Sequence, residues 1–359
     1  MCLDRAKDEK PNIPFVYVKA KPSRILGVIR VKSVDELKEV IDECLSKEIP
    51  MIPLGSGTTN FAQLIPLKPS VYIDVSEIKG ITSFDENEIS VLPGTNIGEV
   101  LEYLRKRGKS IPVYPSSYNM STIGGFIEGG SGGIGSFKYG THFRVLLKEA
   151  TLYAGETIKL RGEKVLVVTH AWGTTGFLTE VKLNLTDYKE NKLQYFEVNR
   201  TDELKDKILS LYKIRDKVNL VSIYNDKLFS KLFKEEVKKR WVIVTSSEIS
   251  LGSEIGKDER ISFASTIQWD LKWFHQPLTL DSIKVLDKVK EGLIHAEVIR
   301  ENNSPLVLVD HFSTTSPFEE VSFLTIKERL KNLDPELVKY IEKFKKEIDP
   351  KDLFNPLKI

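Results

Sequence analysis

The sequence predicts an α+β protein in which an α/β module is inserted ahead of a helical tail. Two observations carry this prediction. Over the first half of the chain, short strand-like runs are followed by turns of small residues. At about residue 186 the amino-acid composition changes, and residues 187–240 are rich in Lys and Glu and contain no glycine. We therefore expect three parts: residues 1–186, 187–312 and 313–359.

Composition excludes several classes of protein. The 53 basic and 51 acidic residues nearly cancel, so the chain shows no electrostatic footprint for nucleic acid. No apolar run is long enough to span a membrane, and the N-terminus lacks the apolar region of a signal peptide, so we expect a cytoplasmic protein. Lys and Glu dominate the charge, as is typical of a thermophile. The 2 cysteines cannot bind an iron–sulfur cluster, which needs four thiolates.

The opening of the chain predicts a β-α-β unit that ends on a loop of small residues. Ser33 and Glu36 form a capping-box pattern ahead of an amphipathic helix, and Met51–Leu54 is typical of a buried strand. The loop Pro53–Asn60 follows directly. It is not a dinucleotide fingerprint, because Asn60 stands where the third glycine belongs and no helix follows. Its free N–H groups and hydroxyls suit a pyrophosphate held in another geometry.

A glycine-rich stretch, Tyr114–Gly140, is the segment around which we expect the chain to be organised. Seven of the 22 glycines lie between Gly124 and Gly135, among Ser and Thr and with no acid before Glu128. Ordered glycine costs entropy, so the cluster needs a reason. Main-chain donors around a phosphate-bearing ligand are one reason, and a flexible linker is the alternative. Interspersed apolar residues such as Phe126 favour the packed interpretation.

The remaining pattern is a series of strands and helices. Strands are expected at 71–76, 88–94, 177–185, 241–247, 261–269 and 305–312, with a hairpin around Ala154-Gly155. Helices are expected at about 97–107, over much of 187–240, near 280–291 and in the tail. A third small-residue turn, Gly173–Gly176, leads into the strand at 177–185.

These turns and the tail together resemble the FAD-linked oxidases of the vanillyl-alcohol oxidase and p-cresol methylhydroxylase type. The similarity is greatest to the flavin subunits of glycolate oxidase and D-lactate dehydrogenase. It covers residues 25–185 and 345–359. The motifs that carry it are Pro53–Thr59, Pro93-Gly94, Ser121–Gly125 with Gly132-Gly133, Lys138–Gly140, Gly173–Glu180, Asp349-Pro350 and Asn355-Pro356.

The resemblance implies a two-subdomain FAD-binding domain, an inserted cap over the flavin, and a C-terminal segment that returns to the first domain. FAD is the implied cofactor. The residues implied to bind it are Pro53, Gly55, Ser56, Gly57, Thr58, Thr59, Asn60, Pro93, Gly94, Pro115, Ser121, Thr122, Ile123, Gly124, Gly125, Gly132, Gly133, Ser136, Tyr139, Gly173, Thr175, Gly176, Phe177, Leu178 and Asn355.

The sequence departs from the family in two places. The first loop lacks the His that carries covalent FAD in some members, so we expect non-covalent FAD, with His142 as a minor alternative. The His-rich metal and substrate motif of the 2-hydroxy-acid members is also missing. Only His311 remains in the matching region, so no metal site is expected.

Oxidising an alcohol on a flavin requires a base for the hydroxyl proton. His275 is the first candidate, because it ends a Trp-rich run suited to a carboxylate substrate, although that run also fits a surface loop. His311 is the second candidate. His170 and Trp172 precede the third turn and are expected to shape the adenosine pocket.

Three functions are compatible with these features. The first is an FAD-dependent dehydrogenase or oxidase acting on a small 2-hydroxy acid or a related alcohol or sugar. The second is an FAD-carrying subunit that needs an iron–sulfur partner, which the missing His motif favours. The third is a nucleotide-binding scaffold without a redox role. The substrate and electron acceptor stay open.

Overall fold

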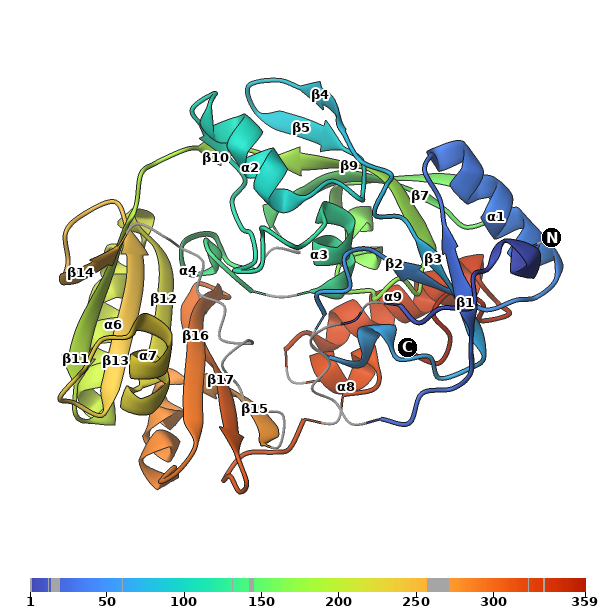
Figure 1. Cartoon of the computed structure of the whole chain (residues 1–359). Helices are drawn as coiled ribbons and strands as arrows, with labels where there is room; N and C mark the ends of the chain where they lie inside the picture. Colours follow the sequence, from blue (N-terminus) through green and yellow to red (C-terminus); the bar gives the residue numbers. More distant parts are fainter. Residues whose placement is uncertain are drawn as a thin grey trace.

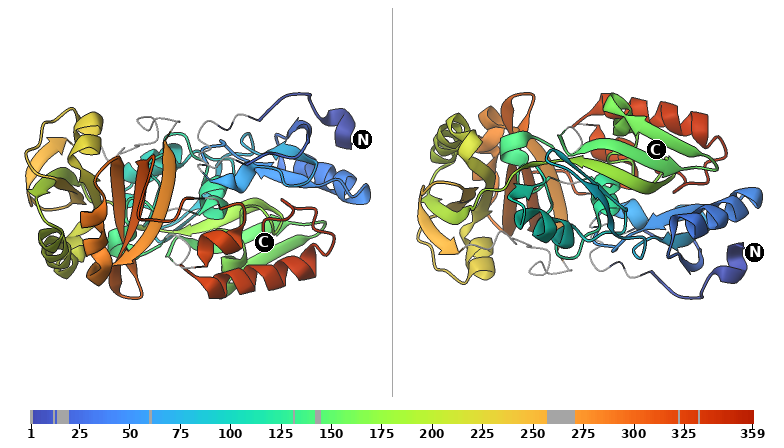
Figure 2. Two further views of the ribbon diagram at one scale, coloured as in Figure 1. Left: turned by 90° about the horizontal axis from the view of Figure 1, so that it is seen from below. Right: turned by 90° about the horizontal axis from the view of Figure 1, so that it is seen from above.

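A computed structural model defines the architecture over residues 2–11, 13, 20–59, 61–130, 132–141, 145–256, 271–321, 323–331 and 333–359. The molecule is elongated. Residues 192–256 and 271–313 form a sheet-and-helix unit at one end, and both termini lie toward the other end (Figures 1 and 2). At that other end, the N-terminal elements and the layer containing β7–β9 and α9 form two adjacent lobes (Figure 2).

The expected β-α-β opening is present. Strands β1 (Ile25–Arg30), β3 (Ser70–Asp74) and β2 (Met51–Leu54) pair in parallel in that order. Helix α1 (Val34–Ser46) begins where the Ser33 side chain accepts a hydrogen bond from the N–H of Glu36, at 3.2 Å. Short 3-10 turns η1 (Cys2–Arg5) and η2 (Ala62–Leu64) flank this unit.

The second sheet has the strand order β4-β5-β9-β7-β8. Its strands are β4 (Ile81–Phe84), β5 (Glu88–Val91), β7 (Leu147–Tyr153), β8 (Thr157–Arg161) and β9 (Phe177–Asn184). Helix α2 (Ile97–Arg105), the 3-10 turn η3 (Gly162–Val167) and the small pair β6 (Lys109–Ser110) with β10 (Thr186–Asp187) lie around it. The hairpin around Ala154-Gly155 is confirmed.

The glycine-rich stretch is not a linker. It forms two short helices, α3 (Ile123–Gly129) and α4 (Ser136–Tyr139), which the sequence pattern did not predict. Ile123, Phe126 and Ile127 are buried in the same core cluster as the second sheet. Gly133 and Gly135 take positive φ, where a side chain would also collide with the backbone of Tyr114 and Pro112.

The third sheet is antiparallel throughout, in the order β14-β11-β13-β12-β16-β17-β15. Its strands are β11 (Lys192–Val198), β12 (Val218–Asn225), β13 (Trp241–Ser247), β14 (Ser253–Gly256), β15 (Lys272–Thr279), β16 (Leu293–Glu301) and β17 (Ser304–Ser313). Helices α6 (Thr201–Lys213) and α7 (Asp226–Phe233) and the 3-10 segments η4 (Arg215–Lys217) and η6 (Leu280–Lys288) cover it.

Two predictions for this region need correction. Residues 187–240 are not mainly helical, because β11 and β12 interrupt them; the apolar alternation of these strands was masked by their Lys and Glu neighbours. The helix expected near 280–291 is a 3-10 segment. The strand expected at 261–269 lies outside the described residues. The division at residues 186 and 312 stays a prediction.

The tail returns to the first half of the chain. Helices α8 (Ile326–Leu330) and α9 (Pro335–Ile348) share a core cluster with Ala171 and Trp172. Beyond α9, Phe354 bridges to Met51 of β2, and the N–H of Asn355 donates to the Met51 carbonyl at 2.7 Å. Within the described residues, no helix has the length and apolar character needed to cross a membrane.

Replacing Phe354 by Ala tests how strongly the tail holds this end of the molecule. Phe354 is fully buried and meets Phe177 edge-to-face, with ring centroids 6.0 Å apart. We expect Phe354→Ala to lower the free energy of unfolding by about 3–5 kcal/mol, measured by urea denaturation. Tyr340→Ala, on the exposed face of α9, is the control and should change it by less than about 1 kcal/mol. Equal losses in the two variants would contradict this packing.

Candidate functional site

A glycine-lined cleft lies where three loops meet. The first loop follows β2, the second leads into and through α3, and the third runs from the turn after η3 into β9. The cleft is lined by Pro53, Gly55, Ser56, Gly57, Thr58, Thr59, Gln63, Leu64, Val75, Pro93, Pro115, Ser117, Ser121, Gly124, Gly125, Phe126, Glu128, Gly129, Gly130, Trp172, Phe177 and Leu178. Three segments distant in sequence therefore build one site.

Thirteen of the residues predicted from the sequence lie on the wall of this cleft. They are Pro53, Gly55, Ser56, Gly57, Thr58, Thr59, Pro93, Pro115, Ser121, Gly124, Gly125, Phe177 and Leu178. Asn60 lies outside the described residues.

The other predicted residues lie behind the wall or beyond it. Thr122 caps α3 by accepting a hydrogen bond from the N–H of Gly125, and Gly94 packs against the carbonyls of Val75 and Ser76. Gly173 packs against Pro53. Seven further predicted residues also lie outside the lining of the cleft. They are Ile123 in α3, Ser136 in α4, Thr175 and Gly176 before β9, Gly132 and Gly133 after α3, and Tyr139, which lines a different cavity.

Asn355 has a distinct role. Its side-chain amide donates hydrogen bonds to the carbonyl of Gln63, at 2.9 Å, and to the carbonyl of Trp172, at 2.5 Å. Gln63 and Trp172 both line the cleft, so Asn355 fixes two of its walls relative to each other without facing the ligand space.

Eight lining residues were not predicted: Gln63, Leu64, Val75, Ser117, Phe126, Glu128, Gly129 and Gly130. Gln63 and Leu64 lie in η2, which no sequence motif marks. The sequence did contain a signal for Glu128, Gly129 and Gly130, because these residues belong to the glycine cluster.

The chemistry of the cleft is that of main-chain donors and hydroxyls. Thr58 Oγ1 lies 2.9 Å from Ser121 Oγ, which lies 2.7 Å from Ser117 Oγ. No Lys or Arg lines the cleft among the described residues. An anionic ligand would therefore be stabilised by backbone N–H groups and hydroxyls rather than by cations.

A second group of polar side chains lies on one face of the third sheet. Asp310 of β17 stands directly opposite His275 of β15 on one side and His295 of β16 on the other. Asp310 Oδ1 lies 2.8 Å from His275 Nδ1, and Asp310 Oδ2 lies 3.6 Å from His295 Nδ1. Since side chains alternate along a strand, Glu297 shares this face with His295.

Glu297 links this face to the glycine-rich segment. Its Oε1 accepts a hydrogen bond from the N–H of Gly133, at 2.6 Å. A side chain at Gly132 would collide with the same carboxylate. The sheet face that carries Asp310 and the two histidines is therefore turned toward the glycine-rich segment that continues from the cleft.

His275 is held at both ring nitrogens. Its Nδ1 pairs with Asp310, and its Nε2 lies 3.0 Å from Arg329 Nη1. Burial and the nearby guanidinium lower the pKa of His275, against the opposing effect of Asp310, so the ring is neutral near pH 7. A neutral ring that donates to Asp310 must accept from Arg329.

The other charges of this cluster are also shifted by burial. Burial alone would raise the pKa of Asp310, but hydrogen bonds from His275 and His295 outweigh it and hold the pKa below its usual range. Burial lowers the pKa of Arg329 to about 10, which still leaves it charged at neutral pH. Arg329 also lies over the ring of Phe61, 4.8 Å from its centroid.

His311, the second predicted base, is placed elsewhere. It points to the opposite face of β17, where Nδ1 lies 2.7 Å from Ser316 Oγ and Nε2 lies 2.7 Å from the Glu291 carbonyl. The structure therefore places His275 in the cluster around Asp310 and places His311 outside it. His170 packs against Gly130, and His142 lies outside the described residues.

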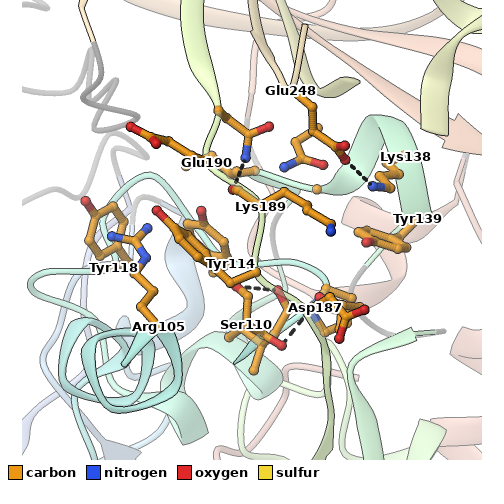
Figure 3. A pocket seen from close by; sticks show the side chains of 18 residues that line it. Arg105, Ser110, Tyr114, Tyr118, Lys138, Tyr139, Asp187, Lys189, Glu190 and Glu248 are labelled. Carbon is orange, nitrogen blue, oxygen red and sulfur yellow. Dashed lines mark hydrogen bonds and ion pairs between the residues drawn. The ribbon is translucent and has the colours of Figure 1, made fainter. Parts of the chain in front are cut away.

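A separate cavity of about 420 Å³ lies beside the connection from β10 to β11 (Figure 3). Tyr114, Tyr118 and Tyr139 line it together with three basic and three acidic side chains: Arg105, Lys138, Lys189, Asp187, Glu190 and Glu248. Lys138 and Glu248 pair across it at 3.2 Å. Its acidic side chains make it a poor site for a diphosphate, in contrast to the glycine-lined cleft.

Part of the chain matches a known family of domains. Residues 25–161, which hold two of its three loops, match the family described as FAD binding domain. Over these residues the chain is similar to FAD binding domains. Two curated relatives are a glycolate oxidase subunit of Bacillus subtilis, 29% identical over 178 residues, and a mitochondrial D-lactate dehydrogenase (cytochrome) of Arabidopsis thaliana, 26% identical over 170 residues.

These matches cover part of each protein. They span 46% of this chain and 38% of the Bacillus subunit, and 44% of this chain and 30% of the Arabidopsis enzyme. The FAD-binding fold extends further. An alkyldihydroxyacetonephosphate synthase structure is 16% identical with a TM-score of 0.71, over 92% of this chain and 75% of its own. The 6-hydroxy-D-nicotine oxidase of Arthrobacter nicotinovorans is 15% identical, with a TM-score of 0.67 over 95% and 93%.

The residues of the cleft fit FAD. Glycines let a flat ring and a diphosphate approach the backbone, and Phe177, Leu178 and Val75 supply apolar walls. Among the described lining residues there is no His or Cys that could bind the flavin covalently. Trp172 also lines the cleft, and its expected place in the adenosine pocket stays a prediction.

Adding a side chain at Gly125 in the glycine-lined cleft, from here on called the FAD cleft, tests the placement of the cofactor. A Cβ at Gly125 would come within 2.9 Å of one side-chain atom, Thr122 Oγ1, which must shift, and the rest of a larger side chain would occupy the cleft that Gly125 lines. We expect Gly125→Val to raise the Kd for FAD roughly 100-fold, measured by quenching of flavin fluorescence. Gly125→Ala is the graded control and should weaken binding less. Unchanged FAD affinity in the Val variant would refute this placement.

Proposed function

We propose that the protein is an FAD-dependent oxidoreductase that oxidises a small 2-hydroxy acid, or a related alcohol, with FAD held non-covalently. One observation carries this proposal. The sheet face turned toward the glycine-rich segment bears a buried carboxylate and two histidines, and the buried Arg329 of α8 contacts one of these histidines. Such groups are the ones that this substrate class requires. FAD, when bound, supplies the acceptor for the hydride.

Arg329 and His275 are suited to holding the substrate. A guanidinium binds a carboxylate through parallel N–H donors, and Arg329 keeps its charge in a largely apolar surrounding of Phe61 and Phe323. Its contact with His275 and, through it, with Asp310 fixes its orientation. This support favours a substrate with an acidic group.

His295 is the better proton acceptor. Both ring nitrogens of His275 are occupied, so His275 fits a positioning role in this geometry. His295 lies beside Asp310 on the strand whose Glu297 reaches the glycine-rich segment. Asp310 would stabilise the protonated form of His295 after it takes the hydroxyl proton. We therefore propose His295, rather than His275, as the catalytic base.

An FAD spectrum followed by anaerobic titration tests the function. The purified protein should show flavin absorbance, and a 2-hydroxy acid such as glycolate or D-lactate should bleach it. Bleaching by a neutral alcohol but by no hydroxy acid would refute the role of Arg329. Flavin absorbance that no substrate bleaches would refute the proposal of independent activity.

Comparing two histidines separates catalysis from packing. We expect His295→Gln to lower kcat by about 10²–10⁴-fold while FAD remains bound, because the general base is lost. His311→Gln should lower the melting temperature, because a buried hydrogen-bonding group is disturbed, but leave kcat within about threefold. Substrate-dependent flavin reduction in stopped flow gives the readout. A larger loss of rate in the His311 variant would reverse the assignment.

The second candidate function is an FAD-carrying subunit that passes electrons to an iron–sulfur partner. The relative from Bacillus is itself named a subunit, and no cluster of His, Cys, Asp or Glu suited to a metal occurs among the described residues. In this case the flavin would be reduced by substrate only after the partner is added.

A further inference from the structure

We propose that Glu128 is a protonated hydrogen-bond donor to the flavin half of FAD, and that FAD binding is therefore coupled to uptake of a proton at alkaline pH. This inference rests on FAD as the cofactor. It concerns a residue that no sequence motif marked. Three features of the cleft support it.

The first feature is the isolation of this carboxyl group. Glu128 is the only ionisable side chain among the described residues that line the FAD cleft. Its Oε1 is buried and has no hydrogen-bond partner. Leaving a buried polar atom without a hydrogen-bond partner costs free energy, which indicates that a bound ligand supplies the partner.

The second feature is the charge of the ligand. FAD brings a diphosphate into a cleft that offers no Lys or Arg among its described lining residues. Because no cation among these residues balances it, an ionised Glu128 is disfavoured, whereas a protonated carboxyl is neutral and offers an O–H donor. Burial raises the pKa of Glu128 to about 8, so the group is mostly protonated near pH 7.

The third feature is the position of Glu128 along the cleft. Thr122, at the start of α3, lies against Gly55 of the first loop, where the diphosphate would bind. Glu128 comes six residues later, about 9 Å along the helix axis. The chain then leads through Gly130 to Gly133, which bonds Glu297 of the substrate-facing sheet. Glu128 therefore lies on the half of the cleft nearer the substrate site, where the flavin ring must be.

Other titratable groups lie on the elements that pack here. The N–H of His170 donates to the Ile127 carbonyl and that of Trp172 to the Glu128 carbonyl, so His170 is on the adjoining segment. Glu297 approaches from β16. Burial also raises the pKa of Glu297, but its Oε1 is already bonded to the Gly133 N–H.

The sign of the coupling follows from these facts. Below about pH 8 Glu128 carries its proton with or without FAD, so affinity is independent of pH. Above about pH 8 the free protein loses that proton and must regain it to bind, so the Kd rises toward tenfold per pH unit. The effect should be specific to ligands that contain the flavin ring.

Titration of the apoprotein with FAD at about pH 7 and about pH 9 tests the inference. For the natural protein we expect the Kd to be about tenfold higher at pH 9. Glu128→Gln keeps a neutral donor and should bind FAD within about threefold of the natural protein at pH 7, with no more than a twofold change at pH 9. Glu128→Ala should bind about tenfold more weakly at both pH values, because one hydrogen bond is lost.

Two controls locate the effect. Glu99→Gln removes an exposed carboxylate on α2 and should retain the tenfold pH dependence. ADP, used as a probe for the other half of FAD, should bind all variants alike at both pH values. An equal pH dependence in Glu128→Gln, or an equal effect on ADP, would overturn the role of Glu128. Failure of every variant, including the natural protein, to bind FAD would instead overturn the cofactor assignment itself.

Discussion

The close approach of three loops around a cleft without cations is the constraint on which the structure depends. Backbone N–H groups can hold a diphosphate only if their loops are fixed relative to one another. Asn355 provides much of this fixation, since its amide bonds the carbonyls of Gln63 and Trp172 while its N–H bonds Met51. The end of the chain therefore completes a site whose lining residues Gln63 and Trp172 lie 292 and 183 positions earlier.

The third sheet adds the chemistry that the cleft lacks. The FAD cleft contains one ionisable side chain among its described lining residues. Asp310, His275 and His295 are instead concentrated on one face of the third sheet, where Arg329 of α8 contacts His275. This separation is physically reasonable. Proton transfer needs charged groups in mutual contact, and a diphosphate bound by the backbone is best kept away from carboxylates.

Much of the cofactor site could be predicted from the sequence, because glycine carries a strong conformational signal. The loops at Gly55, Gly124 and Gly173 all converge on the cleft. What failed was the distinction between lining and supporting residues. Asn355, Gly94 and Gly173 belong to the motifs, but they act by packing or by bonding carbonyls behind the wall. A sequence motif contains residues that the fold requires as well as residues that contact the ligand.

The substrate side was less predictable. His275 and His311 are equally plausible in the sequence, and only strand register shows that one faces Asp310 while the other faces Glu291 and Ser316. The pairing of His295 with Asp310 joins residues on separate strands, which a linear pattern does not reveal. β11 and β12 were missed because their charged neighbours resemble helical surfaces.

Hydrogen–deuterium exchange with and without FAD tests the central claim most directly, because that claim concerns backbone amides. If main-chain donors hold the cofactor, FAD should slow exchange at residues 55–59 and 124–130 and leave residues 186–191, beside the second cavity, unchanged. Protection confined to residues 186–191, with none in the glycine loops, would contradict the account.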